Sequence, residues 1–391
     1  MDRKSFLKTT GIITLGLSLA EKAALAASSR VASSRVSPSP AGTNQLPAWR
    51  GFNLTDFYSP DPAPDKKPTT EEQFKWMMDW GFDFVRLPMA YPHYLKFDRS
   101  KDITPDDVYS IDEQKVQEIE AFIALAHKYN MHVCLNLHRA PGYCVNAGFH
   151  EPFNLWRDKA AQDAMYFHWN MWAKRCKNMT RQQISFDLLN EPCLREDMND
   201  QHSGRGPVPG DLYRKVALGA LDAIRKENPR HLVIADGNNV GNLVIPELAD
   251  LDIAQSCRGY YPHEISHYKA PWVYKDTTNL PDPKWPGMIG DKMMSRDMLE
   301  KYYQPWIQLA QTSKAGVHCG ECGCFSKTPH DVFLAWFSDV RDILSSHQIG
   351  YAAWNFIGDF GILDSRRTDV AYEDWHGHQL DRKFLDLLRK S

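Results

Sequence analysis

Residues 185–192 read SFDLLNEP, an apolar run that ends abruptly in Asn190, Glu191 and Pro192. A strand buried on both faces of a sheet is apolar throughout, so a charged group at its end must emerge where the sheet stops. The stretch therefore predicts a buried parallel strand that delivers Glu191 to the carboxyl edge of a sheet.

Seven further short apolar runs lie along the chain, and segments with a 3.6-residue period alternate with them. A strand followed by a helix, repeated eight times, predicts an α/β fold, the single-domain (β/α)8 TIM barrel, although the helix after the fifth strand is brief. The alternative is a doubly wound open sheet, which needs a glycine-rich phosphate turn that GFNLTDF (51–57) does not provide. In order, the eight predicted strands cover residues 49–54, 82–88, 131–138, 184–192, 231–237, 252–260, 316–323 and 350–356.

The composition narrows the class of partner. With 46 Lys and Arg against 49 Asp and Glu, the 391-residue chain has no basic excess for phosphate backbones, so we expect no nucleic-acid partner. Its 12 Trp, 16 Tyr and 18 Phe exceed the needs of a core, and exposed rings bind the apolar faces of sugars. The sequence does not set the oligomeric state, for which a monomer is the expectation.

The N-terminus predicts a targeting signal at residues 1–27. Basic residues (3–8) precede the apolar stretch GIITLGLSLA, and Ala24-Leu25-Ala26 gives a small-residue cleavage pattern. The sequence R-K-x-F-L-K also resembles a degenerate twin-arginine signal, with Lys4 in place of the second arginine, so the export route stays open. Because a bilayer span needs ~20 apolar residues, we expect no membrane span.

A linker is predicted between this signal and the folded domain. Residues 28–47 are rich in Ser, Ala, Arg and Pro without apolar periodicity, which predicts disorder. Residues 48–391 are then the folded domain of an exported protein, periplasmic or extracellular.

The cysteines are dispersed, and they do not predict a metal site. The segment HCGECGC (318–324) has C-x-x-C and C-x-C spacings, but no second cysteine or histidine pair completes a zinc site. Buried thiols or one local disulfide are favoured, and neither a metal nor a cofactor is expected. The eight are Cys134, Cys144, Cys176, Cys193, Cys257, Cys319, Cys322 and Cys324.

Polar or aromatic residues stand at the ends of six of the eight predicted strands. In a barrel of this kind the catalytic groups lie at the carboxyl ends of the strands, so these residues predict one site. Two carboxylates from different strands suit glycosidic cleavage, with retention at a separation of ~5 Å and inversion at ~6.5–9.5 Å. The residues are Arg86, His138, Asn190 with Glu191, Arg258 with Tyr260, Glu321 and Trp354.

The same residues, in this order, resemble a known family. The chain has RLP on the second strand, LH on the third, NEP on the fourth, a glycine-flanked Glu on the seventh and WNF on the eighth. This ordered set, with FIGDFGILDS after the last strand, resembles glycoside hydrolase family 5, the cellulase-type retaining hydrolases. The resemblance covers about Trp49 to the C-terminus.

The resemblance implies a two-glutamate double displacement, with Glu191 as acid/base and Glu321 as nucleophile. It implies a polysaccharide or oligosaccharide substrate, first a β-1,4-glucan, with mannan, β-1,3-glucan or xyloglucan as alternatives. The residues expected to bind substrate or support the site are Arg86, which would keep the nucleophile ionised, Asn190, which would hold the sugar 2-hydroxyl, His138, Tyr260 and Trp354.

One position departs from the family pattern. Arg258 stands where the family usually has the His of His-x-Tyr, and an obligate cation cannot shuttle a proton. Either Arg258 is an electrostatic clamp, or His263 or His267 in the next loop takes the role.

Aromatic residues in two loops are further candidates. The long stretch 262–286 carries Trp272, Tyr274 and Trp285 among prolines, and a loop of this length on a barrel is usually functional. We expect these rings, with Tyr143, either to wall a sugar-binding cleft or to pack the loops onto the barrel.

Two rival classes of protein remain. A metal-dependent barrel hydrolase would have H-x-H at the first strand, whereas the only H-x-H here, His376 to His378, lies far downstream. A noncatalytic carbohydrate-binding barrel would need no carboxylate pair.

Overall fold

The computed structural model describes residues 44–61, 66–146, 151–197 and 200–390. The chain divides into two compact units, Met1–Ala41 and Gly42–Ser391, and the described residues all belong to the second. The predicted signal and residues 28–43 of the predicted linker lie outside the described residues. The last four linker residues are ordered, because Leu46 is buried and the Asn44 side chain bonds to the backbone of Val317.

Eight parallel strands close into a barrel, which confirms the predicted (β/α)8 fold. Strand order is β2-β1-β13-β12-β9-β8-β5-β3, and β2 pairs with β3 to close the ring. β1 and β2 approach so closely that a Cβ on Gly51 would lie 1.6 Å from the carbonyl oxygen of Phe84. The strands are β1 (Arg50–Asn53), β2 (Phe84–Ala90), β3 (His132–Ala140), β5 (Ile184–Asp187), β8 (Leu232–Asp236), β9 (Ala254–Gly259), β12 (Val317–Cys322) and β13 (Tyr351–Ala353).

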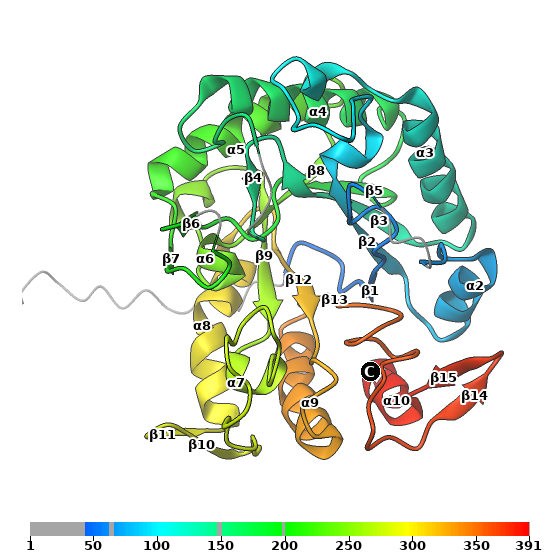
Figure 1. The fold of residues 1–391 in the computed structure, drawn as a ribbon, viewed down its shortest axis with the longest axis vertical. Helices are drawn as coiled ribbons and strands as arrows, with labels where there is room; N and C mark the ends of the chain where they lie inside the picture. Colours follow the sequence, from blue (N-terminus) through cyan, green and yellow to red (C-terminus); the bar gives the residue numbers. More distant parts are fainter. Residues whose placement is uncertain (1–43, 62–65, 147–150, 198–199, 391) are drawn as a thin grey trace, which may run out of the picture. The chain divides into compact units, whose positions relative to one another are not determined.

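The helices lie on the outside of the strands (Figure 1). Sequence signals set several of their starts: Thr70 and Gln73 form a capping box at α2, and Asp112 accepts backbone N–H groups at α3. The helix after β8 is brief, as predicted, because α6 has only four residues. The helices are α2 (Glu71–Asp79), α3 (Glu113–Lys128), α4 (Lys159–Arg175), α5 (Gly210–Arg225), α6 (Asn238–Gly241), α7 (His263–Ser266), α8 (Arg296–Thr312), α9 (His330–Ser346) and α10 (Arg382–Arg389), with 3-10 turns η1 (Tyr91–Tyr94), η2 (Asp107–Tyr109) and η3 (Pro246–Leu248).

Side chains fill the barrel, so its interior is not a channel. Near the amino ends of the strands, Trp49 stacks on His132 with ring centroids 3.8 Å apart, and Phe84 lies against both. Near the carboxyl ends a buried polar layer replaces this apolar one, and it supports the site described below. Short strands decorate the loops: β4 (Tyr143–Cys144), β6 (Leu194–Arg195), β7 (Arg205–Gly206), β10 (Gly287–Ile289), β11 (Lys292–Met294), β14 (Glu373–Trp375) and β15 (His378–Leu380).

Two sequence expectations concern the chain as a whole. All eight cysteines are buried free thiols, so the local disulfide is absent from this described part of the chain. Within the described ranges, every helix is too short or too polar to cross a bilayer.

Candidate active site

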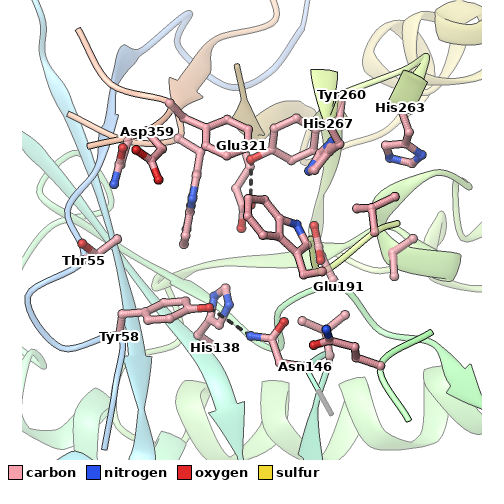
Figure 2. Close-up of a pocket in the computed structure, with 18 of the residues that line it drawn as sticks. Thr55, Tyr58, His138, Asn146, Glu191, Tyr260, His263, His267, Glu321 and Asp359 are labelled. Carbon is pink, nitrogen blue, oxygen red and sulfur yellow. Dashed lines mark hydrogen bonds between the residues drawn. The ribbon is translucent and has the colours of Figure 1, made fainter. Parts of the chain in front are cut away.

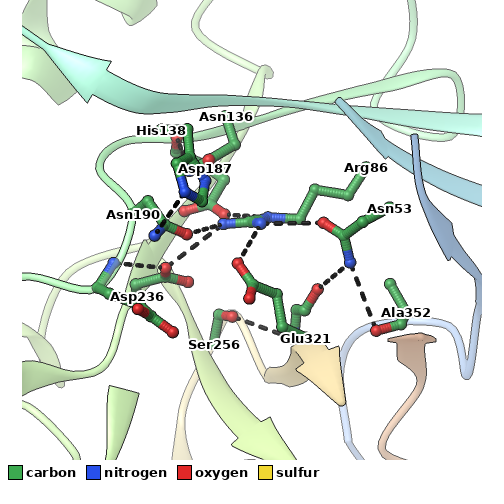
Figure 3. Close-up of polar contacts among 12 residues, drawn as sticks. Asn53, Arg86, Asn136, His138, Asp187, Asn190, Asp236, Ser256, Glu321 and Ala352 are labelled. Carbon is green, nitrogen blue, oxygen red and sulfur yellow. Dashed lines mark hydrogen bonds and ion pairs between the residues drawn. The ribbon is translucent and has the colours of Figure 1, made fainter. Parts of the chain in front are cut away.

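Arg86 on β2 is the centre of the buried polar layer (Figure 3). Its Nε donates to Asp187 and its Nη1 to Glu321, at 2.8 and 2.7 Å. The guanidinium therefore joins β2 to β5 and β12 and holds one predicted catalytic carboxylate. Its other acceptors are Asn53 Oδ1 at 3.0 Å, Asn190 Oδ1 at 2.8 Å and Asp236 Oδ2 at 3.4 Å.

Arg258 on β9 is a second buried cation in the same layer. Its Nε donates to Glu191 Oε1 at 2.9 Å, and its Nη2 donates to Glu321 Oε1 at 3.3 Å. The same guanidinium forms two bonds to Asp236, one of them at 3.0 Å from Nη1 to Oδ1. Arg258 thus contacts both predicted catalytic carboxylates, which matches the electrostatic clamp among the two expectations.

His263 and His267, the other candidates for this position, line the cavity beside the site. In the described part of the chain neither ring bonds to Glu191 or Glu321, and His267 Nδ1 lies 2.9 Å from Ser266 Oγ instead. Burial lowers the pKa of both imidazoles, that of His267 well below its usual range. Both rings are therefore neutral near pH 7, and neither replaces Arg258 as a cation.

Glu191 follows β5 after Asn190, at a bend in the backbone. Its φ of 50° lies in the left-handed region that a residue with a Cβ seldom adopts. The Glu191 N–H donates to Asp236 Oδ2 at 2.9 Å, and Tyr143 donates its hydroxyl proton to the Glu191 carbonyl at 2.6 Å. These two bonds hold the bend that turns the Glu191 side chain into the cavity.

Burial raises the pKa of Glu191 to about 7, and the nearby charge of Glu321 adds to the effect. Arg258 opposes the shift through its charge and its hydrogen bond. A carboxyl with this pKa holds its proton over much of the range around neutrality. Glu191 can therefore donate a proton.

Glu321 on β12 projects from a bulge in the strand. The pairing of β12 with β9 shifts between Cys319 and Glu321, at Gly320. A Cβ on Gly320 would lie 2.5 Å from Ser256 Oγ, so the bulge requires glycine. One carboxylate oxygen, Oε1, accepts from both arginines, and the other, Oε2, accepts from the Tyr260 hydroxyl at 3.1 Å.

The two remaining acids of the layer differ in charge. Burial raises the pKa of Asp187 to about 7, and the neighbouring Asp236 adds to the shift. Burial also disfavours the charge of Asp236, but Arg258 and Arg86 outweigh it and hold the pKa of Asp236 below its usual range. The two cations thus lie beside one carboxyl whose pKa is lowered, Asp236, and two whose pKa is raised, Asp187 and Glu191.

The two glutamates open into one cavity of about 750 Å³ (Figure 2). His138, Tyr260 and Trp354 also line this cavity, whereas Arg86 and Asn190 lie behind it in the polar layer. All seven residues predicted for the site therefore lie in one region of the molecule.

Aromatic rings form one wall of this cavity. His138 stacks with Trp354 at a centroid distance of 5.6 Å, and Tyr58 meets both rings at an angle. Burial, with the charges of Arg86 and Arg258, lowers the pKa of His138 well below its usual range, so the imidazole is neutral. The wall is aromatic and uncharged, as contact with the apolar face of a sugar requires.

The aromatic residues predicted from the loops divide between the two expected roles. Trp272 lines the cavity, so the expectation of a cleft wall is right for this ring. It is wrong for Trp285, whose indole N–H donates to Asp339 at 2.8 Å, and for Tyr143, which is buried beneath Glu191. In the described chain Tyr274 is not among the cavity-lining residues.

Sequence reasoning missed several residues of the polar layer. Asn53 and Asp236 each end a barrel strand, and the criterion that found the other residues would also have found these two. Asp187 lies within SFDLLNEP itself, where a charged residue inside an apolar run is the signal that could have found it. Tyr58, in the loop after β1, carries no strand-end signal.

A closed (β/α)8 barrel with two carboxyl groups in one cavity at the carboxyl ends of its strands defines a class of protein, the barrel glycoside hydrolases. The sequence profile of the family described as "Cellulase (glycosyl hydrolase family 5)" matches residues 40–359. The chain belongs to this family and is a glycoside hydrolase, as the resemblance implied.

Similar proteins agree with this placement. Endoglucanase C of Acetivibrio thermocellus is 27% identical over 328 residues, which are 78% of this chain and 89% of that protein. Cellodextrinase A of Ruminococcus flavefaciens is 25% identical over 285 residues, 71% of this chain and 76% of that protein. A solved structure titled "Crystal Structure of a glycoside hydrolase" superposes with a TM-score of 0.76 at 35% identity, and it covers 88% of this chain and 98% of that one.

Proposed function

We propose that the protein hydrolyses β-1,4-glucan chains with net retention at the anomeric carbon, with Glu321 as nucleophile and Glu191 as acid/base. The supporting observation is the contrast between the two carboxyls in one cavity. Two guanidinium groups contact Oε1 of Glu321, which places two positive charges beside the proposed nucleophile. The raised pKa of Glu191 favours a proton on it, as a general acid needs.

The reaction follows from these charges in two steps. In the first, Oε2 of Glu321 attacks the anomeric carbon, the bond to the leaving oxygen breaks, and Glu191 gives its proton to that oxygen. In the second, Glu191 takes a proton from water, and the water oxygen attacks the same carbon and displaces Glu321. Both glutamates return to their starting states, and water is the only co-reactant consumed.

The other site residues bind and orient the sugar. Both arginines donate to Asn190 Oδ1, and its amide nitrogen, which lies 3.5 Å from His138 Nε2, has a second hydrogen to donate to the sugar 2-hydroxyl. Trp354 supplies a flat face beneath the sugar at the cleavage point, and Tyr260 holds Glu321 Oε2 in position. The neutral His138 adds a hydrogen-bonding ring edge beside them.

The choice of β-1,4-glucan rests on the cellulase family and on relatives named endoglucanase and cellodextrinase. A polysaccharide panel of β-1,4-glucan, mannan, β-1,3-glucan and xyloglucan, assayed for new reducing ends, tests the substrate. NMR of the first-formed anomer tests retention. Greater activity on another glycan would replace the substrate, and an inverted first product would refute the double displacement.

Three variants test the roles of the glutamates. We expect E321Q to abolish hydrolysis, and E191A to cleave only substrates with a good leaving group, with azide restoring turnover as a β-glycosyl azide. E196A is the control, since Glu196 is an exposed glutamate on the same loop that does not line the cavity. An inactive parent that still binds oligosaccharides would instead favour a noncatalytic binding barrel.

We also propose export, because residues 1–27 carry the pattern of a signal peptide and residues 28–43 that of a linker. Fractionation of expressing cells, followed by N-terminal sequencing of the exported form, tests this. A mature chain that still begins at Met1 would contradict the proposal.

A further inference from the structure

Arg258 lies where the family resemblance leads us to expect a histidine, and the structure gives this arginine a contact pattern that an imidazole cannot reproduce. It is 1% exposed and donates to Glu191, Glu321 and Asp236. An imidazole has two nitrogens on one ring edge, whereas a guanidinium has a fork of five N–H donors. Only the fork can contact all three acids.

We propose that Arg258 is a positioning residue that couples the charge of Glu321 to the protonation of Glu191, so that Glu191 acts as an acid in the first step and as a base in the second. The inference rests on the proposed function and adds to it the residue that allows Glu191 to change from acid to base.

The surroundings of Glu191 identify Arg258 as the relevant cation. Arg86 contacts Glu321 but not Glu191. Among the residues the structure describes, Arg258 is thus the cation paired with Glu191. The other titratable groups facing Glu191 are Glu321 on β12, Asp236 at the end of β8, Tyr260 after β9, Tyr58 after β1 and Cys193 after β5.

Charge balance explains the coupling. In the proposed mechanism the nucleophile Glu321 is an anion in the free enzyme and Glu191 carries a proton, so Asp236 and Glu321 balance the two guanidinium groups that contact them. When Oε2 of Glu321 bonds to the anomeric carbon, Glu321 becomes an ester without charge, and Glu191 has passed its proton to the leaving group. The two cations are then balanced by Asp236 and Glu191. The number of charges in the buried layer is therefore the same in both states.

The guanidinium is held rigidly enough to serve this purpose. A Cβ on Gly241 would lie 2.4 Å from Arg258 Cγ, so the side-chain stem packs directly on that glycine. Tyr303 donates its hydroxyl to the Arg258 carbonyl at 3.1 Å, and Ser256 Oγ accepts from Nη1 at 3.1 Å. The cation cannot follow one carboxylate and leave the other.

The first test is the pH dependence of kcat/KM on a cello-oligosaccharide, which falls as pH rises and Glu191 loses its proton. Arg258 stabilises the ionised Glu191, so its removal raises the pKa of Glu191. We expect R258Q to shift the alkaline fall of kcat/KM to higher pH by about one unit or more. R258K keeps the positive charge, so we expect it to shift this fall by less than about half a unit.

The second test isolates the step in which Glu191 is a base. With a dinitrophenyl β-cellobioside the leaving group needs no proton, so kcat reports hydrolysis of the glycosyl-enzyme. We expect R258Q to lower this kcat about tenfold or more and to regain turnover with azide. A merely structural role for Arg258 would not produce the azide effect.

R258H provides the same test if R258Q does not fold. A buried imidazole is neutral near pH 7, so the alkaline fall of kcat/KM must again shift to higher pH. If the parent is active and the alkaline fall of kcat/KM occurs at the same pH in R258Q or R258H, the inference is overturned and the hydrolase proposal stands. A parent that hydrolyses none of these substrates overturns the proposed function itself.

Discussion

Asp187 and Asp236 form a matched pair that tests the charges assigned to the buried layer. Both are aspartates at the carboxyl ends of neighbouring strands, both are at most 1% exposed, and both accept from Arg86. Asp236 accepts three further hydrogen bonds, two from Arg258 and one from the N–H of Glu191, and its pKa is lowered. Asp187 has one oxygen without a partner, and its pKa is raised to about 7. Replacement by Asn is therefore expected to cost little stability at Asp187 and much more at Asp236.

A proton on Asp187 also agrees with its surroundings. Asn136 is its register partner on β3, and Oδ1 of both side chains lacks a hydrogen-bond donor. A protonated carboxyl supplies a donor that two bare acceptors do not. D187N replaces a neutral carboxyl by a neutral amide, so we expect it to cost less than about 1 kcal/mol at pH 5. D236N leaves a buried guanidinium without its counter-charge, which costs about 3–5 kcal/mol.

The pH dependence sharpens the comparison. The pKa of Asp187 is about 7 in the folded chain against an ordinary value of 3.8, so between these values only the folded form holds the proton. The free energy of unfolding then falls as pH rises, by up to about 1.4 kcal/mol per unit, and the contribution is fully present only below about pH 4. D187N lacks this titration. From pH 5 to 7 the parent should therefore lose about 2 kcal/mol relative to D187N.

Urea unfolding at pH 5, 6 and 7, followed by tryptophan fluorescence, measures both quantities. The reasoning is refuted if D187N is as destabilised as D236N at pH 5. It is also refuted if the difference between the parent and D187N does not change with pH. Either result would mean that Asp187 is ionised beside Arg86 and that the layer holds more negative charge than its two cations balance.

Three further predictions concern the cavity and the core. Y260F removes the hydrogen bond to Glu321 Oε2 and should lower kcat/KM about 10- to 100-fold, since bonds to charged groups contribute about 1.5–3 kcal/mol; a change below twofold would contradict this role. W272A should raise KM for long oligosaccharides about three- to tenfold, whereas W285A should leave KM unchanged and lower the free energy of unfolding by about 1–3 kcal/mol; the reverse result would exchange the two placements. Ellman's reagent should label none of the eight buried thiols in the native protein and all eight in guanidinium, and rapid native labelling would show that a thiol is exposed.

The fold was predictable because burial on both faces leaves a strong signal in the sequence. Each of the eight predicted runs overlaps a barrel strand, although β2 and β3 continue two residues beyond their runs. The residues at which each strand begins and ends were less predictable. The run 184–192 becomes a strand only over Ile184–Asp187, although Leu188 and Leu189 are also apolar and buried. Apolar residues indicate burial, but they do not indicate where the backbone hydrogen bonds between neighbouring strands end.

The direction of aromatic side chains was not predictable, for a related reason. Trp272 and Trp285 lie in the same proline-rich loop, yet one lines the cavity and the other bonds to a helix on the outside of the barrel. Tyr143 was expected either in the cleft wall or in the packing of its loop, and its hydroxyl supports the backbone of Glu191 from below. Which surface a ring meets depends on contacts between distant segments, which local sequence does not contain.

The roles of the two glutamates depend on a property that no strand-end pattern shows. The sequence places Glu191 and Glu321 at the ends of two strands but leaves them chemically equivalent. The structure makes them different, because Arg86 and Arg258 both contact Glu321 while Arg258 alone contacts Glu191. In a buried layer with two cations, only two carboxylates can be ionised without an uncompensated charge, and Asp236 already accounts for one. Glu321 is the glutamate that both guanidinium groups contact, which supports its proposed role as nucleophile and that of Glu191 as acid. The proposed division of roles then follows from the positions of the two arginines.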